Sequence, residues 1–300
     1  RHLPANRLSS WDRMATVELR DEERLHEQEG PQPAAGRLAF WWWQMQGWIL
    51  AIGVGIASSV SGWLIEMAVN HLASPRFGWC SGSTFAVRGA CPDNGWHDWS
   101  DGLEGFGLNV SIGVLLAAAS GIMVYLFAPS ASGSGIPEVK TILNGFVMAD
   151  VVSKRTLCVK MPGLALSVAA GMALGKEGPL VHIAVCWAQL MSGIFPQFQN
   201  EAKRRELFSA AAAAGVSTAF GAPLGGVLFS LEEVSSHFPA KTLLRAFTAA
   251  VSAALMLSLL KQSSQGPTLF SVEYNTAVNP GENVAFALLG VVGGLIGAAF

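Results

Sequence analysis

Gly175-Lys176-Glu177-Gly178-Pro179 interrupts a long apolar segment, with apolar residues at 157–174 before it and at 180–194 after it. Glycine and proline break helices, so we expect a helix break where the carboxylate of Glu177 lies. A carboxylate at membrane depth is costly and normally marks an ion or proton pathway. A broken helix also exposes backbone N–H groups, which attract anions. The stretch therefore predicts an ion site at a helix break.

The composition is that of a membrane protein. Of the 300 residues, 51% are hydrophobic and only 13% are charged, whereas soluble domains carry roughly 25% charged residues. The formal net charge of −2 gives no reason to expect a nucleic-acid partner. Because no strand alternation is found, we predict an all-α, polytopic protein with tilted and broken helices in a lipid bilayer.

The chain is expected to contain a polar tail and a membrane domain. Residues 1–40 form the tail, residues 41–300 form the membrane domain, and a polar loop occupies 70–107. The tail is rich in arginine and the loop is acidic, so the positive-inside rule places the N-terminus in the cytoplasm and the loop in the lumen or outside the cell. Four segments are interpreted as full spans: 48–69, 110–127, 243–260 and 284–300.

Shorter apolar pieces lie between the second and third of these spans. Such discontinuous helices are typical of transporter folds with a site near the midplane. The pieces are 136–146, 179–194 and 223–231, with charged connectors at 154–155 and 201–206. The run of small residues at 210–215 predicts a helix face for close packing in the membrane.

Two cysteines of the polar loop, Cys80 and Cys91, leave two possibilities open. They form a disulfide if the loop faces an oxidising lumen. Two free thiols are the alternative, and the sequence does not choose between them.

A second glycine-rich motif is Gly133-Ser134-Gly135-Ile136-Pro137-Glu138. Pro137 suits the first turn of a helix, and an acidic residue at Glu138 favours that turn further. Ser134 would then offer a hydroxyl, and its loop free N–H groups, to an anion. A tight turn with a helix cap is the plainer interpretation of the same residues.

Lys176 and Glu177 admit three interpretations. A nucleotide P-loop is excluded because its lysine must be followed by Ser or Thr. A structural carboxylate paired with a cation stays open. In the third interpretation Glu177 is a gate, because a carboxyl group in an apolar site can take up a proton near neutral pH. The charged form then competes with an anion for the N–H groups, and the neutral form leaves.

A third motif, Gly221-Ala222-Pro223-Leu224-Gly225-Gly226, leads to the acid pair Glu232-Glu233. Neighbours on a helix point about 100° apart, so we expect one acid in solvent and the other inward; two surface acids are the alternative. His237 follows, but the HExxH spacing is absent and we predict no metal site. His182, on an apolar segment, is expected to be a packed histidine.

The three motifs, in this order and spacing, resemble the CLC family of chloride channels and anion/proton exchangers. The resemblance covers roughly 48–300, the first half of that family's membrane domain and of its inverted repeat. Residues 200–206, 209–215 and 220–233 look most like the eukaryotic endosomal exchanger branch.

This resemblance implies roles for individual residues. Ser134 matches the serine that helps to coordinate the central anion, and Glu177 matches the gating glutamate that exchanges protons with the outer or lumenal side. Glu233 matches the internal proton glutamate, which channel members lack, so it favours an exchanger. Serine rather than proline at 134 favours chloride over nitrate. The expected anion-binding residues are Ser134, Gly133, Gly135, Ile136, Pro137, Gly175, Lys176, Gly178 and Pro179.

Parts of the family pattern are expected outside this chain. It begins with Arg1 and stops at Phe300 within an apolar run, so we expect a longer protein. The resemblance implies a second half with another filter loop and a tyrosine, then cytoplasmic CBS domains that could bind nucleotides. It implies no cofactor within 1–300, a homodimer, and an endosomal, Golgi or vacuolar membrane.

Three other functions are weighed against a chloride/proton exchanger. A voltage-gated chloride channel of the same family differs only in lacking proton flux, and Glu233 argues against it. An intramembrane enzyme would use Glu177 and Glu233 as acid and base, but no nucleophile or metal set accompanies them. A structural membrane scaffold leaves the buried acid and the repeated helix breaks unexplained.

Overall fold

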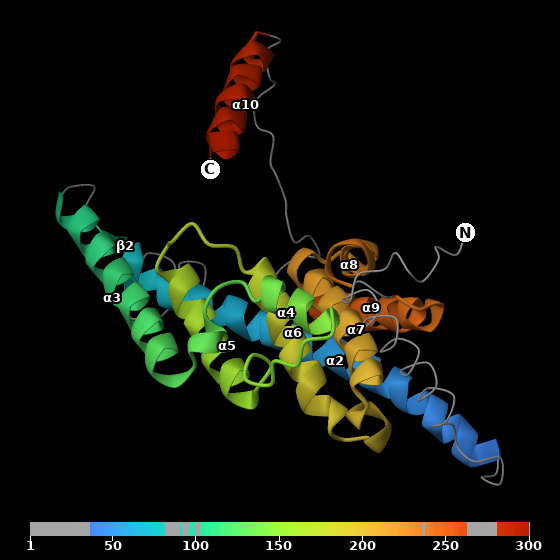
Figure 1. Cartoon of the computed structure of the whole chain (residues 1–300). Coiled ribbons are helices and arrows are strands. Elements are labelled where there is room, and N and C mark those ends of the chain that lie inside the picture. The colour runs from blue at the N-terminus through green and yellow to red at the C-terminus, as the bar shows by residue number, and fades with distance from the viewer. Residues whose placement is uncertain are drawn as a thin grey trace. The chain divides into compact units, whose positions relative to one another are not determined.

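The computed structural model describes residues 37–81, 91, 96–99, 103–235, 238–262 and 281–299. The chain divides into two units, Arg1–Gly266 and Pro267–Phe300 (Figure 1). Both are helical where described, apart from one pair of short strands, which confirms the all-α class. Four described helices are long and apolar enough to cross a membrane: Trp41–Arg76, Glu104–Phe127, Lys241–Lys261 and Glu282–Ala299.

The first two spans are longer helices than the sequence predicted. Helix α2 covers Arg37–Ala73 and α3 covers Leu103–Phe127. Thus α2 begins inside the expected tail, and both helices extend into the expected loop. The apolar run at 38–43 continues the helix upstream, which explains the earlier start. The remainder of the tail, 1–36, lies outside the described residues.

The loop between these helices contains a small antiparallel sheet, which the sequence analysis missed. After a short 3₁₀ turn, η2 (Ser74–Arg76), strand β1 (Gly78–Cys80) pairs with β2 (Trp96–Asp98). Strands of three residues are too short for an alternating pattern to be recognised. A disulfide joins Cys80 to Cys91, so of the two possibilities, a disulfide or two free thiols, the structure has the disulfide.

The broken helices begin close to the predicted positions. They are α4 (Ile136–Leu143), α6 (Glu177–Ser192) and α8 (Pro223–Phe229). A 3₁₀ turn, η4 (Pro129–Ala131), precedes α4, and η5 (Pro196–Gln199) follows α6.

The two charged connectors are themselves helical. They form the first turns of α5 (Lys154–Ala169) and α7 (Glu201–Phe220). The side chain of Ser153 accepts a hydrogen bond from the Thr156 N–H at 3.1 Å, and Asn200 accepts one from Ala202 N–H at 2.9 Å. These N-caps start each helix before its apolar part, so the charges lie in a helical turn.

Helix α7 lies at the centre of the first unit, where it contacts α2, α6, α8 and α9 (Ala240–Gln262). Its residues from Leu207 to Ala219 are buried. A Cβ atom on Gly215 would lie 2.6 Å from the Cα of Val181, so the backbones of α6 and α7 meet there directly. The small-residue run is therefore the close-packing face that was predicted. Helix α10 (Glu282–Ala299) belongs to the second unit and has no buried residue.

Candidate functional site

The starts of two broken helices meet at Ser134 and Gly178. Helix α4 begins after Gly135, and α6 begins with Glu177 after its N-cap residue Lys176. A Cβ atom on Gly178 would lie 2.8 Å from the Cβ of Ser134, so only glycine lets these two segments of the chain approach this closely. The first N–H groups of a helix have no partner within it. Two such helix ends are therefore brought to one place.

The loop before α4 has the backbone that its glycines predict. Gly133 and Gly135 have φ values of +68° and +84°, which residues other than glycine rarely adopt. Behind the loop, a Cβ on Gly135 would lie 2.6 Å from the Cβ of His182. Ser134 is exposed, and its hydroxyl accepts a hydrogen bond from the Ile136 N–H at 3.4 Å. Ser134 thus lies on the open side of the loop.

A buried lysine supports this loop from behind. Lys160, on α5, is only 3% exposed, and its ammonium donates to the carbonyl oxygens of Ala131 at 3.2 Å and Gly133 at 3.1 Å. The side-chain nitrogen of Lys160 therefore lies behind the Ser134 loop and holds its backbone. The sequence analysis did not single out Lys160, although a lysine within an apolar stretch was a usable signal.

His182 is interior, as expected. It is fully buried, and its Nε2 donates to the carbonyl oxygen of Val151 at 3.0 Å. In the part of the chain that the structure describes, no group of three or more His, Cys, Asp or Glu side chains could hold a metal ion. His237 lies outside the described residues.

Glu177 is the first residue of α6 and is half-buried. Its carboxylate folds back onto Gly175, where an added Cβ would overlap with Oε2. No described residue forms a hydrogen bond or ion pair with this carboxylate. Glu177 is therefore next to the meeting point of the two helix starts, and none of the described residues fixes its carboxylate there.

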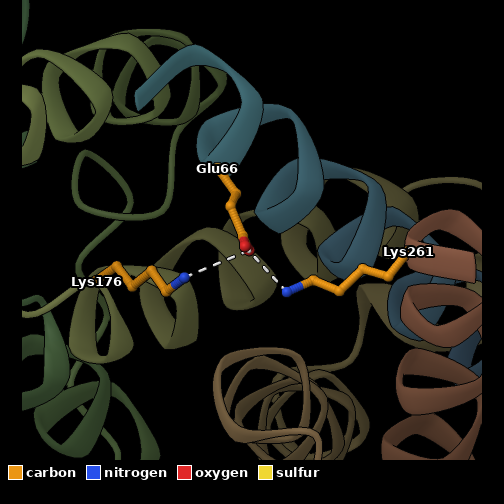
Figure 2. A network of polar contacts seen from close by, with 3 residues as sticks. All are labelled: Glu66, Lys176 and Lys261. Atoms are coloured by element: carbon orange, nitrogen blue, oxygen red, sulfur yellow. Dashed lines mark hydrogen bonds and ion pairs between the residues drawn. The ribbon is translucent and has the colours of Figure 1, made fainter. Parts of the chain in front are cut away.

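The neighbouring lysine is held by a different acid. Figure 2 shows the Glu66 carboxylate, on α2, between the ammonium groups of Lys176 and Lys261. The Nζ–Oε distances are 3.4 Å to Lys176 and 3.0 Å to Lys261, which lies in the last turn of α9. The structural interpretation of a paired charge thus applies to Lys176 and Glu66, rather than to Glu177. Sequence reasoning missed Glu66 and Lys261, because residues this far apart in sequence carry no local pattern.

The acid pair of the third motif lies in a π-helical turn, η6 (Ser230–Val234). Glu232 and Glu233 are both exposed, so the expectation of one inward acid is wrong. The buried residues of the turn are Ser230 and Val234, and the two acids face away from them. The π-turn ends the helix at the surface of this part of the chain, which explains the outward direction.

Glu233 forms an ion pair with Lys140 of α4, at 2.8 Å between Nζ and Oε1. Lys140 lies one helical turn after Ile136, so α4 links the Ser134 loop to the turn that carries Glu233. The structure therefore joins the first two motifs directly and the third through one helix. Lys140 had no signal of its own in the sequence.

Comparison with known proteins supports a family assignment. A family model described as "Voltage gated chloride channel" matches residues 114–300. Human H(+)/Cl(-) exchange transporter 5 is 43% identical over 282 residues, and human H(+)/Cl(-) exchange transporter 3 is 44% identical over 282 residues. Each alignment covers 85% of this chain and 34% of the relative, so the chain spans about a third of the length of these relatives.

Two solved structures are similar in fold. A eukaryotic CLC transporter superposes with a TM-score of 0.63 at 27% identity, covering 86% of this chain and 43% of that one. A slow cyanobacterial Cl−/H+ antiporter gives a TM-score of 0.60 at 27% identity, covering 84% of this chain and 55% of that one.

Proposed function

The chain belongs to the voltage-gated chloride channel family, and from this premise we propose that its full-length gene product exchanges chloride for protons across a membrane. The observation that carries the proposal is the contact between the Ser134 loop and Gly178, the neighbour of Glu177. It gives one position at which an anion and a titratable carboxylate can compete. The similarity to relatives named as exchange transporters supports the same activity.

The anion is proposed to bind where α4 and α6 begin. Chloride must lose water, and helix N-termini can replace that hydration with fixed dipoles. The proposed binding residues are Gly133, Ser134, Gly135, Ile136, Pro137, Gly175, Lys176, Gly178 and Pro179. Lys176 would contribute through its backbone, because its ammonium is engaged by Glu66. Without a full cation in contact, chloride would bind weakly enough to be released.

Protons are proposed to move through two glutamates. Glu177 takes up a proton from the outer or lumenal side, which removes the carboxylate from competition with chloride. Its lack of a described partner favours movement between the anion site and solvent. Glu233 would relay protons from the cytoplasmic side, and its exposure gives the carboxylate access to water. Coupling follows because charged Glu177 and chloride cannot occupy one place together.

The wider organisation is proposed by similarity to the family. It includes a cytoplasmic N-terminus, a lumenal or extracellular 70–107 loop, a homodimer and an endosomal, Golgi or vacuolar membrane. The Cys80–Cys91 disulfide favours an oxidising side for the loop. No cofactor is proposed for 1–300; nucleotides would bind CBS domains outside it. An enzymatic role has less support, since the relatives described above are named as transporters.

A reversal-potential measurement tests the proposal and separates it from the channel alternative. The full-length gene product is reconstituted in a planar bilayer with a fixed chloride gradient, and pH is changed on one side. An exchanger's reversal potential shifts with the pH gradient, whereas a channel's stays constant. Bilayers without protein provide the control. Absence of any chloride current or flux from folded protein would contradict both alternatives.

A further inference from the structure

We propose that Glu66 is a positioning residue that keeps the Lys176 ammonium away from the Glu177 carboxylate. Glu177 then stays free to gain and lose its proton. The inference rests on the proposed function, because it concerns the regulation of the same gate. Glu66 lies on α2, far from the glycine-rich motifs in sequence.

The observation behind this inference is an ion-pair network built from three elements (Figure 2). The carboxylate of Glu66, on α2, lies 3.4 Å from the ammonium of Lys176 at the start of α6. It lies 3.0 Å from the ammonium of Lys261 at the end of α9. Its side chain is 32% exposed, and those of Lys176 and Lys261 are 33% and 17% exposed. Lys176 contacts Oε2 and Lys261 contacts Oε1, so one carboxylate holds both cations. Partial burial limits the screening of these pairs by water.

Lys176 has a second acid within reach, which is the residue directly after it. Adjacent Cα atoms are about 3.8 Å apart. The flexible side chain of Lys176 can turn its ammonium toward Glu66 or toward Glu177. In the structure the ammonium points to Glu66, and Glu177 has no ion pair with a described residue. Glu66 therefore withdraws the cation that would otherwise lie nearest to the gate.

Loss of Glu66 would change the behaviour of Glu177. A lysine that pairs with a carboxylate favours its charged form. Protonation of Glu177 would then be hindered at a given pH, and proton-coupled transport would slow. Because the network is partly exposed, the expected effect is about a two- to fivefold fall in proton flux.

A mutant cycle in proteoliposomes of the full-length gene product tests the inference. Chloride-driven proton uptake is measured at one fixed pH for wild type, Glu66→Gln, Lys176→Met and the double variant. Glu66→Gln should lower the uptake about two- to fivefold. In the Lys176→Met background the same change should have no further effect, because the cation that Glu66 restrains is absent. An equal fall in both backgrounds, or no fall in either, overturns the inference.

A second background separates positioning from general damage. Chloride flux is compared between Glu177→Ala and Glu66→Gln/Glu177→Ala, where no gate remains to be regulated. Equal fluxes support the inference, whereas a further loss shows that Glu66 acts on the fold and overturns it. Glu104→Gln provides the matched control, since it removes an exposed acid from the first turn of α3 and should leave uptake unchanged.

Lys261→Met covers the case in which Glu66→Gln does not give a monodisperse protein. Without Lys261, Glu66 keeps its pair with Lys176 through Oε2. Proton uptake should therefore stay within about twofold of wild type, and a larger loss overturns the inference. Failure of wild-type protein to couple chloride and proton movement would instead contradict the proposed function, so the two failures are distinguishable.

Discussion

The start of α6 and the turn that carries Glu233 are built in different ways. At the start of α6, Gly178 packs against Ser134 so closely that a single added carbon would lie 2.8 Å from the serine Cβ. At the turn, Glu233 is exposed and contacts α4 through the flexible side chain of Lys140. The first region is set by backbone approach and the second by a side-chain ion pair. Filling the close approach at Gly178 should therefore cost more than breaking the ion pair between Glu233 and Lys140.

The largest expected effect follows from filling the close approach. Gly178→Ala places a carbon against Ser134 and would push the starts of α4 and α6 apart. Because misplacement of a site by about 1 Å can cost up to about a hundredfold, we expect chloride flux to fall at least about tenfold. Flux in proteoliposomes measures this loss. Gly225→Ala is the matched control, since its Cβ would lie at an ordinary 3.6 Å from the Cβ of Ala222.

Removing the gate carboxylate should abolish coupling without blocking the pathway. In Glu177→Ala, chloride no longer competes with a carboxylate, so passive chloride flux should remain while proton transport is lost. A liposome assay with a chloride electrode and a pH dye follows both ions. Chloride-driven proton uptake that persists in this variant would contradict the gating role.

Removing the acid of the exposed turn should affect one ion more than the other. Glu233→Ala takes away the proposed relay and its pair with Lys140, so proton movement should stop while some chloride movement remains. Glu232→Ala is the matched control, because it removes an adjacent exposed acid from the same turn. Full coupling in Glu233→Ala would overturn the exchanger assignment.

A change at Ser134 should alter selectivity rather than coupling. Ser134→Pro removes a hydroxyl from the open side of the loop, and the family resemblance implies that proline at this position favours nitrate over chloride. A lost hydrogen bond of about 1 kcal/mol corresponds to roughly a fivefold change in relative preference for nitrate. Anion substitution under voltage clamp measures the ratio. Unchanged selectivity would count against a filter role for Ser134.

The smallest effect is expected for the partner of Glu233. Lys140→Met breaks an exposed ion pair, whose two side chains are 40% and 56% exposed. Pairs of this kind contribute about 0.2–1 kcal/mol, so proton flux should change less than about fivefold and chloride flux should not change. Lys154→Met, at an exposed lysine of α5, is the control. A loss as complete as that of Glu233→Ala would show that the ion pair itself is required.

The same difference in construction explains what could be predicted from the sequence. Gly135, Pro137 and Gly178 determine local backbone geometry, so the positions of the helix breaks could be predicted from short patterns. Glu66 and Lys140 acquire their partners only through tertiary packing, and those contacts were missed. The expectation that one acid of the Glu232-Glu233 pair points inward was also wrong, because the α-helical periodicity behind it does not hold in a π-turn.

The disulfide between Cys80 and Cys91 stabilises the segment that joins α2 to α3. Cys80 and Cys91 are 11 residues apart, and closing a ring of this size lowers the entropy of the unfolded chain by an amount worth roughly 3 kcal/mol. Thiol reductants remove that contribution by opening the ring. Because disulfides form and persist in oxidising environments, the fraction of protein with this disulfide formed would report whether the segment has been exposed to one.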